Sequence, residues 1–134
     1  AVKGVDNATF HGWLSPDDLP LYFKAMDVVY YCLRLDYPGA VYNAPNTLGQ
    51  AMAAKKPIIA NDVGDLGQII RETSCGVLLD EVNAETISKA ITQLQEPGFR
   101  TQLGENGFEA AQRNYSMAPT NKLMIDAYEQ LFID

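Results

Sequence analysis

Apolar and polar positions follow two patterns along this chain, one typical of helices and one typical of buried strands. Four residues stand at i, i+3, i+4 and i+7 and so share one helix face: Leu48, Ala51, Met52 and Lys55. The short run Ile58–Ala60 is apolar and largely β-branched, as in a parallel strand covered on both faces. The pattern therefore predicts a helix that begins at Pro45 and is followed closely by a buried strand.

The same two patterns predict that strands and helices alternate along the rest of the chain. We expect strands at 7–12, 28–33, 58–60 and 75–79. We expect helices from Ser15 to about Met26, from Pro45 to about Lys55, and over 66–73, 84–94, 99–114 and 116–132. Alternation of this kind is typical of an α/β fold, a Rossmann-like parallel sheet with helices on both faces. Residues 1–134 are expected to form a single domain of this type.

The helix that begins near Pro45 follows a long loop, Arg34–Ala44, and this arrangement is of functional interest. Proline fits the first helical turn, where a missing N–H costs nothing. The free N–H groups and partial positive charge of a helix N-terminus suit phosphate. In open parallel sheets the ligand crevice lies beyond the carboxyl ends of the strands. We therefore expect phosphate at the main-chain amides of Asn46, Thr47 and Leu48, with plain helix capping as the alternative.

Charge and cysteine content exclude several classes of function. The formal net charge is −7, from 17 acidic and 10 basic residues, which argues against a nucleic-acid surface and against docking on anionic lipid. No apolar run approaches the length of a membrane span. Cys32 and Cys75 lie far apart and are expected to be reduced thiols of a cytoplasmic protein, with a disulfide as the alternative. Two cysteines and a lone His11 do not make a usual zinc site, so no metal is expected.

Several stretches of the chain, taken in order, resemble the C-terminal, donor-binding domain of retaining glycosyltransferases of the GT-B fold, the large group that uses nucleotide-sugars. The resemblance is carried by Asn7–Leu14, Leu21–Val28, Pro45–Pro57, Asp62–Ile70, Cys75–Leu79 and Asn114–Ser116. Within the third stretch, Pro-Asn-Thr-Leu-Gly-Gln-Ala-Met-Ala-Ala-Lys-Lys-Pro resembles the family pattern P-N-K-L-x-E-A-M-A-A-G-K-P. The matches cover nearly the whole chain.

The resemblance implies particular residues of a donor site. A nucleotide-sugar diphosphate would lie on the amides of Asn46, Thr47 and Leu48, and Gly64 would approach the donor with its backbone. Residue Gln50 stands where the family has the second Glu of a Glu-x7-Glu motif, which contacts the ribose. Its amide can still bond a hydroxyl but cannot make a charge-assisted contact. The first Glu of the motif falls at about Tyr42.

Alternatives remain open at several of these positions. Gln50 is equally a solvated helix residue, and Gly64 is equally a turn residue that needs a positive φ. His11 falls at a strand end, where it reaches the ligand crevice or serves as a hydrogen-bonded structural residue. No catalytic residue is identified, since no Ser or Cys stands with His11 in a recognisable motif. Two further departures from the family pattern are Thr47 in place of Lys and Lys55 in place of a tight-turn Gly.

The resemblance also implies what this chain does not contain. The first β-α unit of the donor domain and the whole N-terminal acceptor domain are missing from it. The implied function is transfer of a sugar from a nucleotide-sugar to an acceptor, with no cofactor, by a longer protein of which this piece alone is inactive. A degenerate, non-catalytic domain used for binding or assembly is the alternative, because both motif carboxylates are absent. The missing unit would expose a sheet edge, which predicts self-association, and any attachment to a membrane surface would belong to the absent domain.

Overall fold

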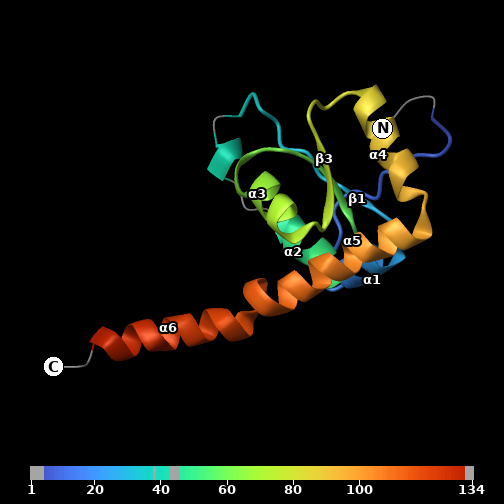
Figure 1. Cartoon of the computed structure of the whole chain (residues 1–134). Coiled ribbons are helices and arrows are strands. Elements are labelled where there is room, and N and C mark those ends of the chain that lie inside the picture. Colours follow the sequence, from blue (N-terminus) through green and yellow to red (C-terminus); the bar gives the residue numbers. More distant parts are fainter. Residues whose placement is uncertain (1–4, 38, 43–45, 132–134) are drawn as a thin grey trace.

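The computed structural model describes residues 5–37, 39–42 and 46–131 and shows an α/β fold (Figure 1). Its elements in chain order are α1 (Leu19–Ala25), β1 (Val29–Tyr30), η1 (Ala40–Tyr42), α2 (Asn46–Ala53), β2 (Ile58–Asn61), α3 (Gly64–Thr73), β3 (Gly76–Leu79), α4 (Ala84–Leu94), α5 (Pro97–Ala110), η2 (Ala111–Tyr115) and α6 (Met117–Leu131). Element η1 is a 3-10 turn and η2 is a π-helical turn. The predicted fold class is confirmed.

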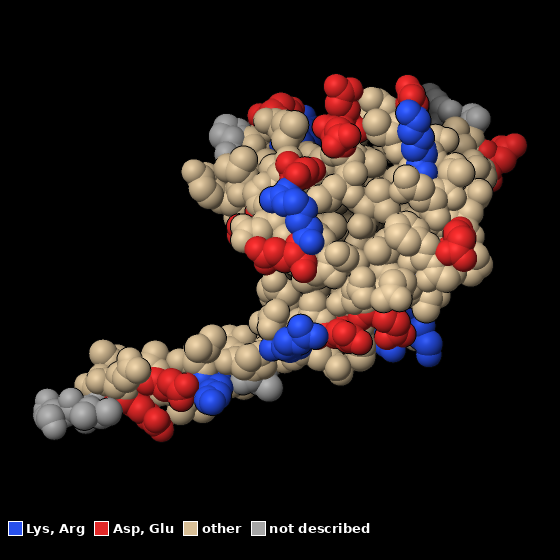
Figure 2. All heavy atoms as spheres, viewed as in Figure 1, with Lys and Arg blue, Asp and Glu red and all other residues tan. Residues whose placement is uncertain are grey.

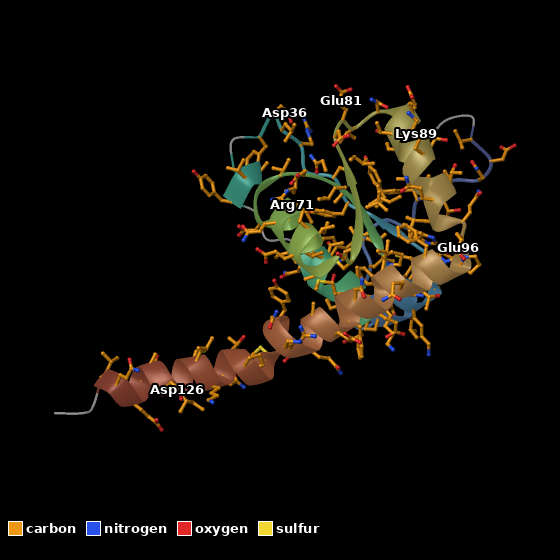
Figure 3. All side chains as sticks on the ribbon, viewed as in Figure 1. Asp36, Arg71, Glu81, Lys89, Glu96 and Asp126 are labelled. Carbon is orange, nitrogen blue, oxygen red and sulfur yellow. The ribbon has the colours of Figure 1, made fainter. Side chains whose placement is uncertain are left out.

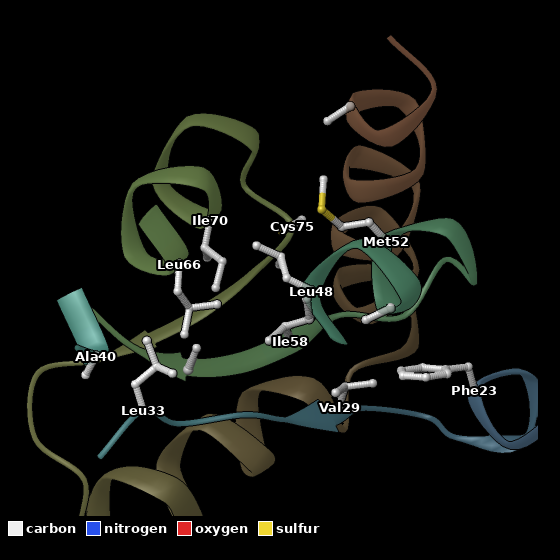
Figure 4. Close-up of a cluster of buried hydrophobic side chains, with 13 residues drawn as sticks. Phe23, Val29, Leu33, Ala40, Leu48, Met52, Ile58, Leu66, Ile70 and Cys75 are labelled. Carbon is white, nitrogen blue, oxygen red and sulfur yellow. The ribbon is translucent and has the colours of Figure 1, made fainter. Parts of the chain in front are cut away.

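The three strands form one parallel sheet in the order β1-β2-β3. The central strand β2 pairs with both neighbours, and all four of its residues are buried. Side chains of α1, α2 and α3 pack on one face of the sheet around Ile58, as Figure 4 shows. On the other face, Ile59 packs with side chains of α4 and α5, among them Leu94 and Leu103. The sheet is therefore covered on both sides, as the apolar run of β2 predicts.

The predicted strand at 7–12 is wrong, because residues 5–14 are irregular in the structure. Phe10 and Trp13 are 84% and 95% exposed. A strand needs a neighbour to bond its N–H and C=O groups. Within the described residues the sheet ends at β1, so this segment has no strand beside it. The ladder of β1 is likewise shorter than the predicted 28–33.

Several helix boundaries also differ from the prediction. Ser15 does not begin α1. Its carbonyl accepts hydrogen bonds from the Asp18 and Leu19 amides at 3.0 and 3.2 Å, so a turn precedes the helix. Helix α5 begins at Pro97 rather than at residue 99, because the Glu96 carboxylate accepts hydrogen bonds from the Gly98 and Phe99 amides. These bonds lower the pKa of Glu96.

Helix α6 follows η2 and extends away from the rest of the molecule (Figure 1). Apolar side chains along it are exposed, namely Met117, Leu123, Met124, Ile125, Tyr128 and Leu131. Figure 2 shows acidic and basic side chains among uncharged surface on the visible face of α6. Among the helices that the structure describes, none has the length and apolarity needed to cross a bilayer.

Lys55, which replaces the family's glycine, has a positive φ of 58°. A left-handed backbone costs a non-glycine residue about 1–2 kcal/mol. Two contacts with α5 offset part of this strain. The Lys55 Nζ lies 2.8 Å from a Glu105 carboxylate oxygen and 4.5 Å from the centre of the Phe108 ring. The turn between α2 and β2 is thus coupled to α5.

The glycines of α2 and α5 provide a test of this packing. A methyl group added at Gly104 would lie 2.3 Å from the Lys55 carbonyl oxygen, whereas one added at Gly49 would meet nothing within 4 Å. We expect Gly104→Ala to destabilise the chain by about 1–3 kcal/mol through overpacking. Gly49→Ala should stabilise it by about 0.5–1 kcal/mol through helix propensity. Urea denaturation measures both effects, and equal shifts for the two variants would contradict the close approach of α5 to Lys55.

The two thiols are expected to differ in reactivity. Both cysteines are unpaired, Cys32 half-buried and Cys75 fully buried. Burial raises the pKa of the Cys75 thiol and so lowers its thiolate fraction at any given pH. Iodoacetamide should therefore label Cys32 first in the folded chain and Cys75 only after unfolding. Mass spectrometry of the intact chain and of a Cys32→Ser control measures this order, and equal labelling rates would contradict it.

Candidate functional site

The first turn of α2 presents the amides that the sequence assigned to phosphate. Asn46 is exposed, Thr47 is half-buried and Leu48 packs into the core. The first amides of a helix have no partner within the helix. Among residues 5–37, 39–42 and 46–131, no side chain accepts a hydrogen bond from the amides of Asn46, Thr47 or Leu48. The predicted Pro45 and the preceding two residues lie outside the described part of the chain.

Gln50 lies one turn further along α2 and faces a groove between α1 and α2. The groove has a volume of about 490 Å³. Its lining consists of Pro16, Leu19, Pro20, Phe23, Lys24, Gln50, Ala53, Ala54 and Lys55. The walls are mostly apolar, and the Gln50 amide is a polar group with both donors and an acceptor. An apolar groove with few polar groups has the character of a small-molecule site.

The loop that precedes α2 is packed against the start of α3. Gly64, the first residue of α3, has a φ of 52°. A methyl group there would lie 2.1 Å from the Val41 carbonyl oxygen. The backbone freedom and small size of Gly64 are thus already required by contact with η1, whatever the ligand. Tyr42, at the end of η1, is 85% exposed.

His11 packs against α1. Its ring lies 5.2 Å from the ring of Tyr22, centre to centre, with an angle of 75° between the two planes. This edge-on contact is typical of aromatic pairs. The residue is exposed. The contact joins His11 to α1.

A second cleft, of about 600 Å³, lies beyond the carboxyl ends of the three strands. Its acidic side chains include Asp36, Asp62 and Glu81, and Figure 3 shows Asp36 and Glu81 along the same edge. Arg34 donates to Asp36 at 3.0 Å and lowers the pKa of that carboxyl group. The excess of carboxylates makes this cleft less suitable for a phosphate than the first turn of α2.

The structure brings some predicted site residues together and separates others. Gln50 and the first turn of α2 share one helix. Gly64 contacts the backbone of Val41, the residue before Tyr42 in η1. The α1 wall of the groove was not predicted as part of a site, because its Leu19 and Phe23 carry an ordinary apolar helix pattern. Asn61 begins a segment, 61–65, that the sequence places at the carboxyl end of a strand, but no role of its own was predicted for it. It ends β2 and is the buried polar side chain of the described core. Within the described residues, no group of three or more His, Cys, Asp or Glu could hold a metal ion.

Comparison with known proteins places this chain in a family. The pattern of the family "Glycosyl transferases group 1" matches residues 2–110. The chain is 28% identical over 116 residues to a D-inositol 3-phosphate glycosyltransferase of Salinispora tropica, a match that covers 84% of this chain and 22% of that protein. It is 35% identical over 65 residues to an uncharacterized glycosyltransferase of Methanocaldococcus jannaschii, covering 48% of this chain and 18% of that one.

A solved structure shares the fold. The sucrose-phosphate synthase of Thermosynechococcus elongatus superposes with a TM-score of 0.76 and 28% identity, over 92% of this chain and 30% of that one. The chain thus spans less than a third of the length of these relatives. Because the family pattern covers most of the sequence, this chain belongs to the glycosyl transferases group 1 family.

Proposed function

We propose that this chain is the donor-binding part of a longer glycosyltransferase and that it binds the nucleoside diphosphate part of a nucleotide-sugar. The observation that carries the proposal is the place of Gln50 in the α1–α2 groove, next to the first turn of α2. The four residue steps from Asn46 to Gln50 rise about 6 Å along the helix. A single ligand of nucleotide size can therefore reach both the groove and the amides of the first turn.

The groove suits the nucleoside. Leu19, Pro20 and Phe23 offer apolar surface to the flat face of a base. The Gln50 amide has donors and an acceptor for ribose hydroxyls. The volume of about 490 Å³ lies within the usual range of small-molecule pockets.

The first turn of α2 suits the diphosphate. The amides of Asn46, Thr47 and Leu48 and the positive end of the helix dipole favour negative charge. When the bond to the sugar breaks, negative charge develops on the departing diphosphate. Preorganised N–H donors stabilise such charge without reorganisation. In this proposal the acceptor is held by another domain of the longer protein.

A second candidate function is favoured by the side chains at the motif positions. Gln50 and Tyr42 stand where the family has two carboxylates, and Tyr42 is largely exposed. A domain without these charges could bind a nucleotide, or assemble with another protein, without supporting transfer. Transfer assays on the longer protein, before and after Gln50→Glu, separate the two functions. Transfer by the native protein would rule out the non-catalytic alternative.

The proposal has further parts that belong to the longer protein. It assigns this protein to carbohydrate biosynthesis in the cytoplasm. For this chain on its own, the proposal includes self-association through the edge of β1, since β1 ends the sheet in the described part of the chain.

Replacement of one amide donor tests the diphosphate site. Thr47→Pro removes an N–H from the first turn, where proline remains compatible with the helix. We expect native chain to bind at least one of UDP, GDP and ADP more tightly than the matching nucleoside. Thr47→Pro should reduce that difference in affinity about tenfold, the value of a hydrogen bond to a charged group. Isothermal titration calorimetry with the three nucleoside and diphosphate pairs measures it.

Thr47→Ala is the matched control for this test, because it removes the hydroxyl and keeps the amide. It should retain most of the gain in affinity that the diphosphate provides. If native chain binds none of the three diphosphates more tightly than its nucleoside, the proposed function is wrong.

Substitution of Gln50 tests the ribose contact. Gln50→Ala should weaken binding of the preferred nucleoside diphosphate about 2–10-fold through the loss of neutral hydrogen bonds. Gln50→Glu should strengthen it, because charge-assisted bonds are stronger. Neither change should matter for the 2′,3′-dideoxy form of the same nucleotide. The exposed Gln68, which bonds Glu72 on α3, supplies a control in Gln68→Ala. An equal effect of Gln50→Ala on both nucleotide forms would contradict the ribose assignment.

A further inference from the structure

Two lysines line the α1–α2 groove, and they differ in what surrounds their charge. The Lys55 Nζ lies 2.8 Å from a Glu105 carboxylate oxygen and over the ring of Phe108, so its charge is already paired with α5. Among the residues that the structure describes, no acidic side chain forms an ion pair with Lys24. Lys24 is therefore the cation that this groove can offer to a ligand.

Lys24 lies at a defined end of the groove. Phe23 of α1 and Met52 of α2 belong to one core cluster on the same face of the sheet (Figure 4). Each helix leads directly into its own strand, and Val29 at the start of β1 lies opposite Ile58 at the start of β2. Both helices thus end at the amino ends of the two strands. The last turn of α1, with Lys24, is at the same end of the groove as the last turn of α2.

The groups along α2 follow the order of the parts of a nucleotide. In the proposed function the diphosphate lies on the amides of the first turn, and Gln50 contacts the ribose. Ala53 and Ala54 come one turn later and also line the groove. From Asn46 to Ala53 the helix rises about 10 Å. The methyl side chains of the two alanines leave room for a flat ring, so the base would lie beside them, at the end of the groove where Lys24 stands.

The α1 wall places the ammonium of Lys24 at the rim of this space. Pro20 and Lys24 are four residues apart on a helix and so share one face. Lys24 is exposed, and a long lysine stem covers apolar surface while its charged end stays in water. A ring that rests on the apolar surface of Pro20 would therefore present an edge, rather than a face, to the ammonium.

An ammonium group distinguishes the edges of the four bases. It has three donors and no acceptor. Uracil and guanine carry a carbonyl oxygen where cytosine and adenine carry an amino group. The oxygen accepts a hydrogen bond from the ammonium, whereas the amino group is itself a donor and leaves both groups without a partner.

We propose that Lys24 is a specificity-determining residue of the donor site, which selects a base with a ring carbonyl oxygen, uracil or guanine, over cytosine or adenine. This inference rests on the proposed function for the placement of ribose and diphosphate. A lysine in the last turn of α1 also complements the helix dipole. That role uses the charge alone and does not distinguish one base from another.

The experiment compares two pairs of nucleotides, UDP with CDP and IDP with ADP. Within each pair the carbonyl oxygen is replaced by an amino group. The base ratio is defined as the dissociation constant of the amino form divided by that of the carbonyl form, measured by isothermal titration calorimetry. Native chain should give a ratio of about ten in at least one pair, the value of a hydrogen bond to a charged group. The pair with the larger ratio tells whether the base is a pyrimidine or a purine.

Three substitutions of Lys24 separate its donors from its stem. Lys24→Met keeps an unbranched stem without donors and should bring the base ratio to about one. Lys24→Gln offers both a donor and an acceptor and should also bind the two forms alike, whereas Lys24→Arg keeps the donors and should retain the preference. Lys122→Met is the matched control, because it removes the same charge from α6, which extends away from the groove (Figure 1). It should leave the base ratio unchanged.

The outcomes separate this inference from the proposed function. A base ratio of one in both pairs for native chain, or a native ratio in Lys24→Met, would overturn the inference. The proposed function stands in either case if the diphosphates still bind more tightly than their nucleosides. If native chain and its Lys24→Met variant show the expected ratios for nucleosides and the diphosphate adds no affinity, the proposed function fails and base selection by Lys24 stands. Absence of binding by every nucleotide and nucleoside would overturn both.

Discussion

The burial of β2 on both of its faces is the constraint on which the rest of the structure depends. Ile58 packs under α2 and α3, and Ile59 packs under α4 and α5. Full burial of such a side chain contributes about 1.5–3 kcal/mol. Because successive side chains of a strand point to opposite faces, a shift by one residue would exchange the two cores. The register of β2 therefore fixes where Asn61 ends the strand and where α3 begins.

Elements that are stabilised by local interactions, or that carry a dense apolar pattern, were predictable from the sequence. Strand β2 and helix α4 carry such patterns, and α4 also has a capping box at Asn83 and Thr86. The absence of a strand at 7–12 was not predictable from these residues alone, because a strand forms only beside another one. The composition of residues 7–12 is compatible with a strand. The described part of the chain, however, has no strand beside this segment.

The candidate site was predicted only in part, for a similar reason. The start of α2 and Gln50 could be predicted as candidates because helix ends and family motifs consist of consecutive residues. The groove could not, since Leu19 and Phe23 carry the same pattern as any packed helix and their approach to Gln50 is a tertiary event. Asn61 lies just after the strand predicted at 58–60. Its bonds to Leu33 join positions 28 apart in sequence, and no local pattern reports such a pair.

The left-handed turn at Lys55 has an evolutionary consequence. Glycine would adopt this backbone without strain, so a lysine here depends on what α5 offers it. Glu105 and Phe108 provide that support through an ion pair and a ring face. Positions 55, 105 and 108 should then vary as a set among homologues. Chains with glycine at the turn would be free to change the two α5 residues, and chains with a long basic side chain would not.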